Sequence, residues 1–341
     1  MPLYNIFVKT SDFDYELPQE LIAQTPIEQR DCSRLLVVNR TDGSITHRHF
    51  YDLPDMLREG DFLVFNDSRV LPARLFGHRV GYEGKVEVLL LRRIEPCLWE
   101  VLVKPSRRID AGARIQLDGL LCEVIERKEG AIRVVRFSDE DALEKAGKVP
   151  LPPYIRRPVD NPERYQTVYA RVKGSAAAPT AGLHFTPDLL HRLEAKGVDF
   201  AFVTLHVGLD TFVPVRVDDP ERHHIHREYC QLSPEVAQRL SEAKSQGRRI
   251  VAVGTTSVRV LEQASLDGAI RPFDGWADLF ILPGYKFNAV DVMLTNFHLP
   301  RTTLIMMVSA FAGRDLVSKA YDEAIKERYR FYSFGDAMLI L

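Results

Sequence analysis

Cysteine is scarce in this sequence, and long apolar runs are absent. The four cysteines stand far apart, with no CxxC pair. This spacing excludes a zinc ribbon and a disulfide framework, and scattered thiols are typical of a cytoplasmic protein. The strongest apolar run, residues 304–312, is too short to span a bilayer, and the first residues, MPLYNIFVKT, lack a signal pattern. We therefore expect a soluble cytoplasmic protein.

The chain also has almost no net charge, and it lacks the common nucleotide-binding motifs. The chain has 45 Lys and Arg against 47 Asp and Glu, a net charge of −2. Any contact with nucleic acid must therefore come from local basic patches, such as the Arg pairs at 107–108 and 156–157 beside Pro-stiffened segments. Solvated surface is the plainer reading of these pairs. No GK[ST] loop and no G-x-G-x-x-G follows a strand pattern, which argues against dinucleotide binding.

The 341 residues are enough for two domains, and 45% of them are apolar. Six short alternating segments between residues 74 and 137 predict a small antiparallel barrel or sandwich. Strand and helix patterns alternate from about residue 180 onward, which is typical of an α/β sheet covered by helices. We predict a mixed-sheet α/β main domain, residues 1–73 and 151–341, with an inserted all-β barrel-like domain at 74–150.

The turn in IVAVGTTSVRVLE (250–262) joins a buried strand to a helix. Gly254 is followed by Thr255, Thr256 and Ser257, so the helix start offers N–H groups and hydroxyls to a carboxylate or phosphate. Simple helix capping by a threonine explains the same residues. The pattern alone leaves both readings open.

A second polar cluster follows the predicted strand at 61–65. In FNDSRVLPARL, Asn66, Asp67 and Arg69 come directly after that strand, where open α/β sheets bind ligands. An Asx turn beside a surface arginine is the alternative, and on spacing it is the favoured one.

Three histidines each lie next to a predicted strand end. They are His184 in GSAAAPTAGLHFTP, His206 in HVGLDTF and His298 in TNFHLP. A shared pocket explains this better than coincidence, and histidine suits proton transfer near neutral pH. The segment RHHIHREY (222–229) is predicted to place His224, His226 and Glu228 on one strand face. Without an HExxH motif or a cysteine spacing, we predict no metal site there, and we assign residues 223–226 no role.

Taken together, these segments resemble one family, the S-adenosylmethionine:tRNA ribosyltransferase-isomerases of queuosine biosynthesis. The similarity runs nearly end to end. It includes DFDYELPQELIAQTP, FNDSRVLPARL, LPPYI, AAPTAGLHFT, FVTLHVG, VAVGTTSVR, TNFHLPRTTLIMMVSAFAG and YRFYSFGDAML. One departure is Asp210, which stands where the family usually has glycine.

The resemblance implies a monomeric, metal-free enzyme with S-adenosylmethionine as a consumed cosubstrate and no other cofactor. It implies transfer and isomerisation of the ribose onto 7-aminomethyl-7-deazaguanine at the wobble position of a tRNA with a GUN anticodon. The products would be epoxyqueuosine, adenine and methionine. A methyltransferase using the same cosubstrate and a non-catalytic RNA-binding module are the rival readings, and released adenine separates the first from the family reaction.

On this basis we predict two groups of site residues. The candidates for catalysis are His184, His206 and Thr180. The candidates for substrate binding are Asn66, Asp67, Arg69, Gly182, Thr211, Thr255, Thr256, Ser257, Arg259, Asn296 and His298.

Overall fold

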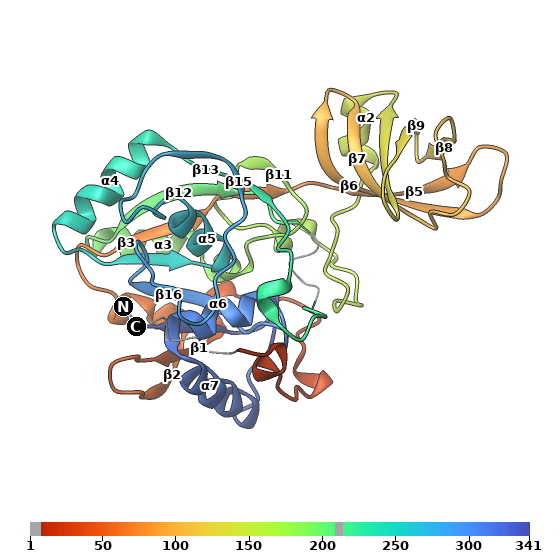
Figure 1. Ribbon diagram of the computed structural model, residues 1–341. Helices are drawn as coiled ribbons and strands as arrows, with labels where there is room; N and C mark the ends of the chain where they lie inside the picture. The colour runs from red at the N-terminus through yellow and green to blue at the C-terminus, as the bar shows by residue number, and fades with distance from the viewer. Residues whose placement is uncertain (1–7, 209–213) are drawn as a thin grey trace. The chain divides into compact units, whose positions relative to one another are not determined.

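The computed structural model describes residues 8–208 and 214–341, apart from the side chain of Glu144. By its internal contacts this part of the chain divides into two compact units (Figure 1). The smaller unit comprises Arg69–Leu151 and Lys173–Ala177, and the larger unit comprises the other described residues. We had assigned all of 151–341 to the main domain. Residues 173–177 are grouped with the smaller unit because strand β11 (Val172–Ser175) pairs with β4 (Ser68–Val70), and the chain enters the smaller unit through β4.

The larger unit is built on one mixed sheet of nine strands, as the strand and helix alternation predicted. Its order is β15 (Phe273–Ala277), β13 (Glu228–Leu232), β12 (Asp199–Leu205), β3 (Phe62–Asn66), β14 (Ile250–Val253), β16 (Val292–Asn296), β17 (Ala337–Ile340), β1 (Arg34–Val38), β2 (Ile45–His49). Strands β12, β3, β14 and β16 run parallel to one another. Their carboxyl ends therefore meet at the same edge of the sheet, where α/β proteins place ligands.

Helices pack on this sheet through apolar stripes. Helix α3 (Pro187–Ala195) buries Leu189 and Leu193 in a core with Phe65 and Val253. The Thr-Pro pair at 186–187 and the Ser-Pro pair at 233–234 predict helix starts. The structure confirms both, because Thr186 Oγ1 and Ser233 Oγ accept the N3 amides of α3 and α4 (Pro234–Ser245). The remaining helices are α1 (Leu53–Met56), α5 (Thr255–Gln263), α6 (Thr303–Ala312) and α7 (Arg314–Lys326).

Two apolar segments whose patterns predict strands are not strands over their predicted length. RFYSFG (330–335) forms no strand, and only residues 276 and 277 of WADLFIL (276–282) belong to one, β15. Tyr332 has a φ of 70°, and the chain turns there before β17 begins at Ala337. The predicted strand over 222–229 is also shorter, since β13 starts only at Glu228. His224 and His226 are exposed while Glu228 is buried, so the three side chains do not share a strand face.

The smaller unit is a closed antiparallel barrel, which confirms the predicted all-β insertion. Its order is β10 (Ile132–Phe137), β7 (Leu98–Lys104), β6 (Lys85–Glu95), β5 (Arg74–Arg79), β8 (Arg114–Leu117), β9 (Leu120–Arg127). Closure pairs every strand on both sides and removes the exposed edges. The short helix α2 (Glu140–Ala146), capped by Asp139, follows the last strand.

Gly77 in β5 allows β8 to approach closely. A Cβ at this position would lie 2.0 Å from the backbone oxygen of Gln116, so no side chain fits. We expect Gly77→Ala to lower the free energy of unfolding of the barrel by about 2–3 kcal/mol, the usual cost of overpacking. Urea unfolding of the two variants measures this, with Gly84→Ala as the matched control because its Cβ would meet nothing within 4 Å. Equal stability of the two variants would contradict this account of barrel closure.

Candidate active site

A pocket lies where β14 and β16 end, at the carboxyl edge of the parallel strands. Its cavity volume is about 40 Å³, and the pocket is partly open to solvent. Five predicted residues line it, namely Thr180, Thr255, Thr256, Asn296 and His298. Of the described residues that line the pocket, none is Lys, Arg, Asp or Glu. The walls therefore offer hydroxyls, amides and aromatic rings in place of fixed charges.

The start of α5 forms one wall. Gly254 precedes it with a φ of 88°, a conformation that favours glycine, and its N–H donates to the Leu294 oxygen of β16 at 2.7 Å. In the described chain no side chain caps this helix, and the first bond within it is Val258 N–H to the Gly254 oxygen. Thr256 Oγ1 is buried and finds no partner among residues 8–208 and 214–341. This helix start therefore has donors available for a ligand.

Asn296 forms the floor and is only 2% exposed. Its Nδ2 donates to the backbone oxygen of Tyr332 at 3.1 Å and lies 3.2 Å from His184 Nε2. The Tyr332 oxygen can only accept, and His184 Nε2 can accept as well, so the side-chain atom of Asn296 that faces them is the donor Nδ2. The other atom, Oδ1, is buried with no partner in the described part of the chain.

His184 lies behind Asn296 and does not line the pocket. Because Asn296 donates to Nε2, the ring carries its proton on Nδ1, which lies 2.7 Å from Ser33 Oγ. Burial, and secondarily the nearby charges of Arg330 and Arg30, lower the pKa of His184 to about 3. His184, a candidate for catalysis, is therefore a neutral ring with a hydrogen-bond partner at each nitrogen.

This buried histidine makes stability depend on pH. Above pH 6.5 the ring is neutral in both states, whereas between pH 6.5 and about 3 only the unfolded chain takes up the proton. The free energy of unfolding therefore falls with decreasing pH, by up to about 1.4 kcal/mol per pH unit from this group. In urea titrations at several pH values, we expect His184→Gln to flatten the slope below pH 6.5 by this amount. Above pH 7.5 the curves of unfolding free energy against pH should be parallel for wild type and variant. Curves that are still parallel at pH 5 would contradict the prediction.

His298 is also held in place. Its Nε2 lies 2.7 Å from Thr295 Oγ1, and its backbone N–H donates to the Tyr321 hydroxyl at 2.9 Å. Burial lowers its pKa to about 3. A ring with that pKa is a weak base, so His298 suits binding better than proton removal.

His206 differs from both. It follows the last residue of β12 and precedes Val207, which lines the pocket, whereas His206 itself does not. Its ring stacks on Tyr229 with centroids 5.9 Å apart. Its Nδ1 is buried and unpartnered within the residues the structure describes. Burial lowers its pKa, and the charge of Asp67 partly opposes this shift. Of the three histidines, only His206 has a buried ring nitrogen without a partner among the described residues.

Asn66 and Asp67, two predicted binding residues, form hydrogen bonds to neighbouring residues of the larger unit. Asn66 exchanges two hydrogen bonds with the Leu205 backbone, at 3.0 and 3.1 Å. Asp67 accepts from Thr204 Oγ1 at 2.7 Å and from Arg171 Nε at 2.6 Å. Both side chains fasten β3 to its surroundings and do not line the pocket.

Four further candidates also lie away from the pocket walls. Ser257 in α5 donates to the Val253 oxygen at the end of β14. Gly182 packs on Tyr169, whose hydroxyl would be 2.0 Å from a Cβ at this position. Arg69 belongs to the smaller unit, and Arg259 makes a buried ion pair with Glu228 at 2.5 Å. Thr211, like Asp210, lies outside the described residues.

Sequence reasoning missed several pocket residues. Tyr154, Tyr332 and Ser333 line it, and the Tyr154 hydroxyl lies 2.7 Å from Ser333 Oγ. Thr302 and Leu304 bring the start of α6 to the same pocket. Tyr154 and Thr302 stand in the quoted segments LPPYI and TNFHLPRTTLIMMVSAFAG, but neither residue type announces a role. Only the fold brings them to β14 and β16.

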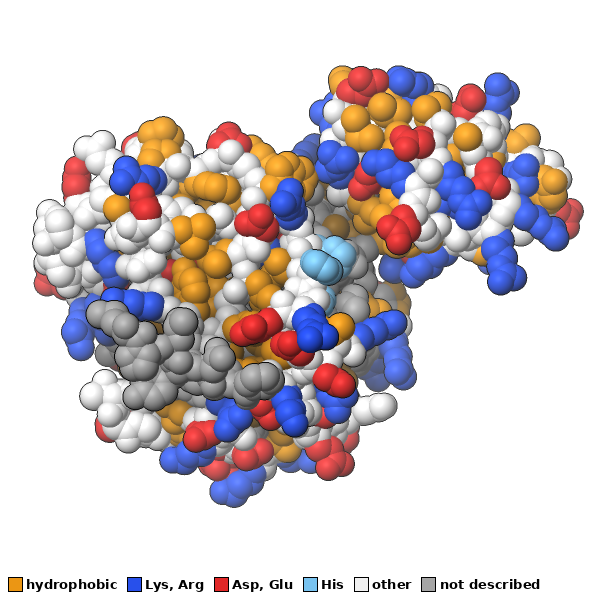
Figure 2. Space-filling model, viewed as in Figure 1, with side chains coloured by type: hydrophobic (Ala, Val, Ile, Leu, Met, Phe, Trp, Pro, Cys, Tyr) orange, Lys and Arg blue, Asp and Glu red, His pale blue; other side chains and the backbone are white. Residues whose placement is uncertain are grey.

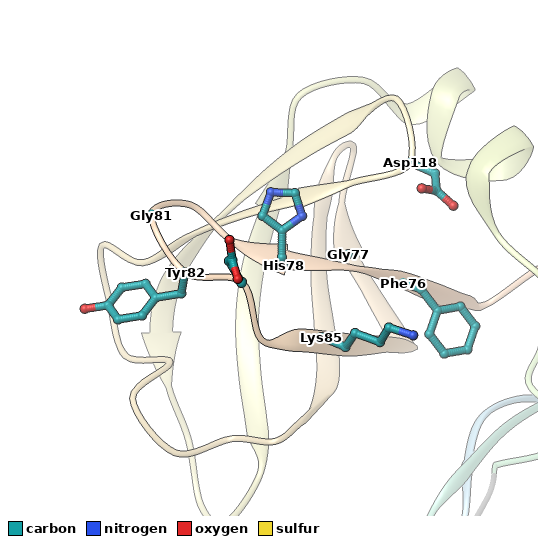
Figure 3. Close-up of a pocket in the computed structure, with 8 residues that line it drawn as sticks. Phe76, Gly77, His78, Gly81, Tyr82, Lys85 and Asp118 are labelled. Atoms are coloured by element: carbon teal, nitrogen blue, oxygen red, sulfur yellow. The ribbon is translucent and has the colours of Figure 1, made fainter.

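A second, open pocket lies on the barrel, between β5, the turn to β6, and Asp118 (Figure 3). Its lining includes Phe76, His78, Glu83 and Lys85, and none of the predicted site residues. Since Glu83 and Asp118 give it fixed negative charges, it does not match the chemistry predicted for the site.

The family model for queuosine biosynthesis proteins matches residues 10–340, almost the whole chain. The chain belongs to the queuosine biosynthesis protein family. The S-adenosylmethionine:tRNA ribosyltransferase-isomerase of Symbiobacterium thermophilum is 56% identical over 341 residues, covering 98% of this chain and 100% of that protein. The enzyme of the same name from Dehalococcoides mccartyi strain CBDB1 is 56% identical over 343 residues, with the same two coverages.

A solved member of the queuosine biosynthesis family supports the fold. The S-adenosylmethionine tRNA ribosyltransferase of Thermotoga maritima is 41% identical, with a TM-score of 0.58, and the match covers 97% of this chain and 100% of that one. The predicted resemblance is thereby confirmed. Among the described residues of the present chain, no group of three or more His, Cys, Asp or Glu could hold a metal ion. None of the described helices of the present chain has the length and apolar character needed to cross a bilayer.

Proposed function

We propose that this protein is an S-adenosylmethionine:tRNA ribosyltransferase-isomerase. It transfers the ribose of S-adenosylmethionine to 7-aminomethyl-7-deazaguanine at the wobble position of a tRNA with a GUN anticodon. Isomerisation of the ribose gives epoxyqueuosine, with release of adenine and methionine. The observation that carries the proposal is the uncharged polar pocket at the ends of β14 and β16, in a chain that matches this family over residues 10–340.

The reaction sets three demands on proton transfer. The sulfonium acidifies the adjacent 5′ carbon, so a base must take a proton there. An acid must help adenine leave, and the aminomethyl group must lose a proton to become a nucleophile. His206 is our candidate proton carrier because its Nδ1 is unpartnered within the described chain. His184 acts as a positioning residue through Asn296, and Thr180 and His298 contribute to the pocket wall.

S-adenosylmethionine is consumed in this scheme, and the proposal includes no other cofactor and no metal. The bond changes involve neither net oxidation nor reduction by an outside reagent, and side chains carry the protons. We further propose that the protein is cytoplasmic, where its tRNA is found, and acts as a monomer.

The barrel is our candidate for contacts with the tRNA backbone. Residues 69–151 and 173–177 contain 17 Lys and Arg against 13 Asp and Glu, a net charge of +4 in a chain of net charge −2. Figure 2 shows Lys and Arg side chains spread over the visible face of this unit. Local positive charge of this kind favours phosphate contacts, which weaken as salt rises.

The test is incubation of the purified protein with S-adenosylmethionine and tRNA that carries the deazaguanine precursor. We expect nucleoside analysis to show epoxyqueuosine, and chromatography of the small molecules to show an equal amount of adenine. tRNA lacking the precursor is the control. Formation of S-adenosylhomocysteine would support the methyltransferase reading, and folded protein without any product would overturn the proposal.

A further inference from the structure

We propose that the pocket between the starts of α5 and α6 is the subsite for the amino-acid end of S-adenosylmethionine. The uncapped start of α5, with Thr256, receives the carboxylate, and Asn296 Oδ1 accepts a hydrogen bond from the α-ammonium group. The inference rests on the proposed function and adds which part of the cosubstrate binds at which atoms.

The first observation concerns the two helix starts. In the described chain, α2, α3 and α4 begin with the side-chain caps Asp139, Thr186 and Ser233, whereas α1, α5, α6 and α7 begin without one. Of these uncapped starts, those of α5 and α6 line the pocket. Unpaired N–H groups and the positive ends of two helix dipoles favour an anion there.

The second observation is independent of the helices and concerns Asn296. This side chain is 2% exposed and lines the pocket, and its Oδ1 meets no donor among the described residues. The contacts of Nδ2 with Tyr332 and His184 prevent the amide from turning over. A buried acceptor without a donor is costly, so this atom is built for a ligand that donates.

A ligand that satisfies both ends carries an anion and a donor a short distance apart. An inorganic phosphate could meet the helix starts and donate an O–H to Asn296, but it carries between one and two negative charges at neutral pH, and the described lining offers it no Lys or Arg. The zwitterionic end of an amino acid has a carboxylate and an ammonium group on one carbon. Charge-assisted hydrogen bonds at both groups suit a pocket without ionised side chains.

The same geometry gives Ser33 and His184 a task. The Ser33–His184–Asn296 chain of hydrogen bonds fixes the amide orientation, because His184 accepts from Nδ2 only while its proton stays on Nδ1. His184 is thus a positioning residue for the ammonium site, and it does not touch the cosubstrate.

The test compares kcat/KM for S-adenosylmethionine with two analogues, in the assay with precursor tRNA. One analogue lacks the carboxylate, and in the other hydrogen replaces the α-amino group. We expect the wild type to lose about 10- to 100-fold with each analogue. Asn296→Leu should lose a similar factor with S-adenosylmethionine yet show no further loss with the deamino analogue. Thr256→Val should reduce the preference for the carboxylate.

Ser257→Ala is the matched control, since its hydroxyl donates to the Val253 oxygen of β14 and does not line the pocket, and this variant should keep both wild-type preferences. The wild-type comparison needs no variant, so misfolding of Asn296→Leu does not decide the question. Wild-type enzyme that turns over S-adenosylmethionine and both analogues equally would overturn the subsite alone. An unchanged ammonium preference in folded Asn296→Leu would do the same, whereas no turnover of S-adenosylmethionine would overturn the proposed function with it.

Discussion

His206→Gln is expected to lower kcat by about 10²- to 10⁴-fold, the usual contribution of a general acid or base. His184 uses both ring nitrogens in buried contacts to Ser33 and Asn296, and His298 uses Nε2 in a contact to Thr295. His206 alone of the three has a buried nitrogen, Nδ1, left without a partner by the described residues. Glutamine keeps a polar side chain of similar length but cannot carry a proton at neutral pH.

Single-turnover rates with saturating S-adenosylmethionine and precursor tRNA measure this loss, because product release then has no influence. His191→Gln serves as the control, since this histidine is exposed on α3, and it should leave the rate unchanged. A wild-type single-turnover rate in His206→Gln would remove His206 from the chemistry. The pocket and its amino-acid subsite would stand unaffected.

Arg259→Met is expected to lower the free energy of unfolding by about 3–5 kcal/mol, the usual cost of leaving a buried charge unpaired. Arg259 is 7% exposed and donates to Glu228, to the His226 oxygen and to the Ala277 oxygen. Glu228 is 6% exposed, and its Oε1 accepts from the Gly208 amide at 2.9 Å. The pair therefore joins α5 and β13 to the residue that follows Val207.

Urea unfolding of the single variants and of the double variant Arg259→Met with Glu228→Met tests this. If the lone carboxylate carries the cost, the double variant recovers part of the stability that Arg259→Met loses. Strictly additive losses would contradict a coupled pair. Because the pair holds Gly208, we also expect Arg259→Met to lose activity beyond its loss of folded protein.

The barrel and the α/β sheet were both predictable from the sequence, because their patterns are local. Alternation over segments such as KVEVLLLR marks strands with one buried side, and Thr-Pro and Ser-Pro mark two helix starts. The strand predicted at 330–335 failed for a reason that no pattern shows. Tyr332 adopts a φ of 70°, and a Cβ at Gly335 would lie 2.4 Å from the Arg330 oxygen, so the chain turns tightly on itself.

The place of the site was predictable, but the side chains that face it were less so. Asn66 and Asn296 are each the last residue of a parallel strand, and the local sequence patterns predict the same binding role for both. In the structure Leu205 of the neighbouring strand β12 satisfies both ends of the Asn66 amide. Asn296 meets partners only on its Nδ2 side. The difference comes from residues 36 to 139 positions away in the sequence, which local patterns cannot report.

The most direct test of the central claim follows two labels from one S-adenosylmethionine, one in its ribose and one in its methyl group. The account predicts that precursor tRNA gains the ribose label in proportion to the adenine released. The methyl label stays in free methionine. Methyl label in the tRNA, or adenine release without ribose label in the tRNA, would contradict it.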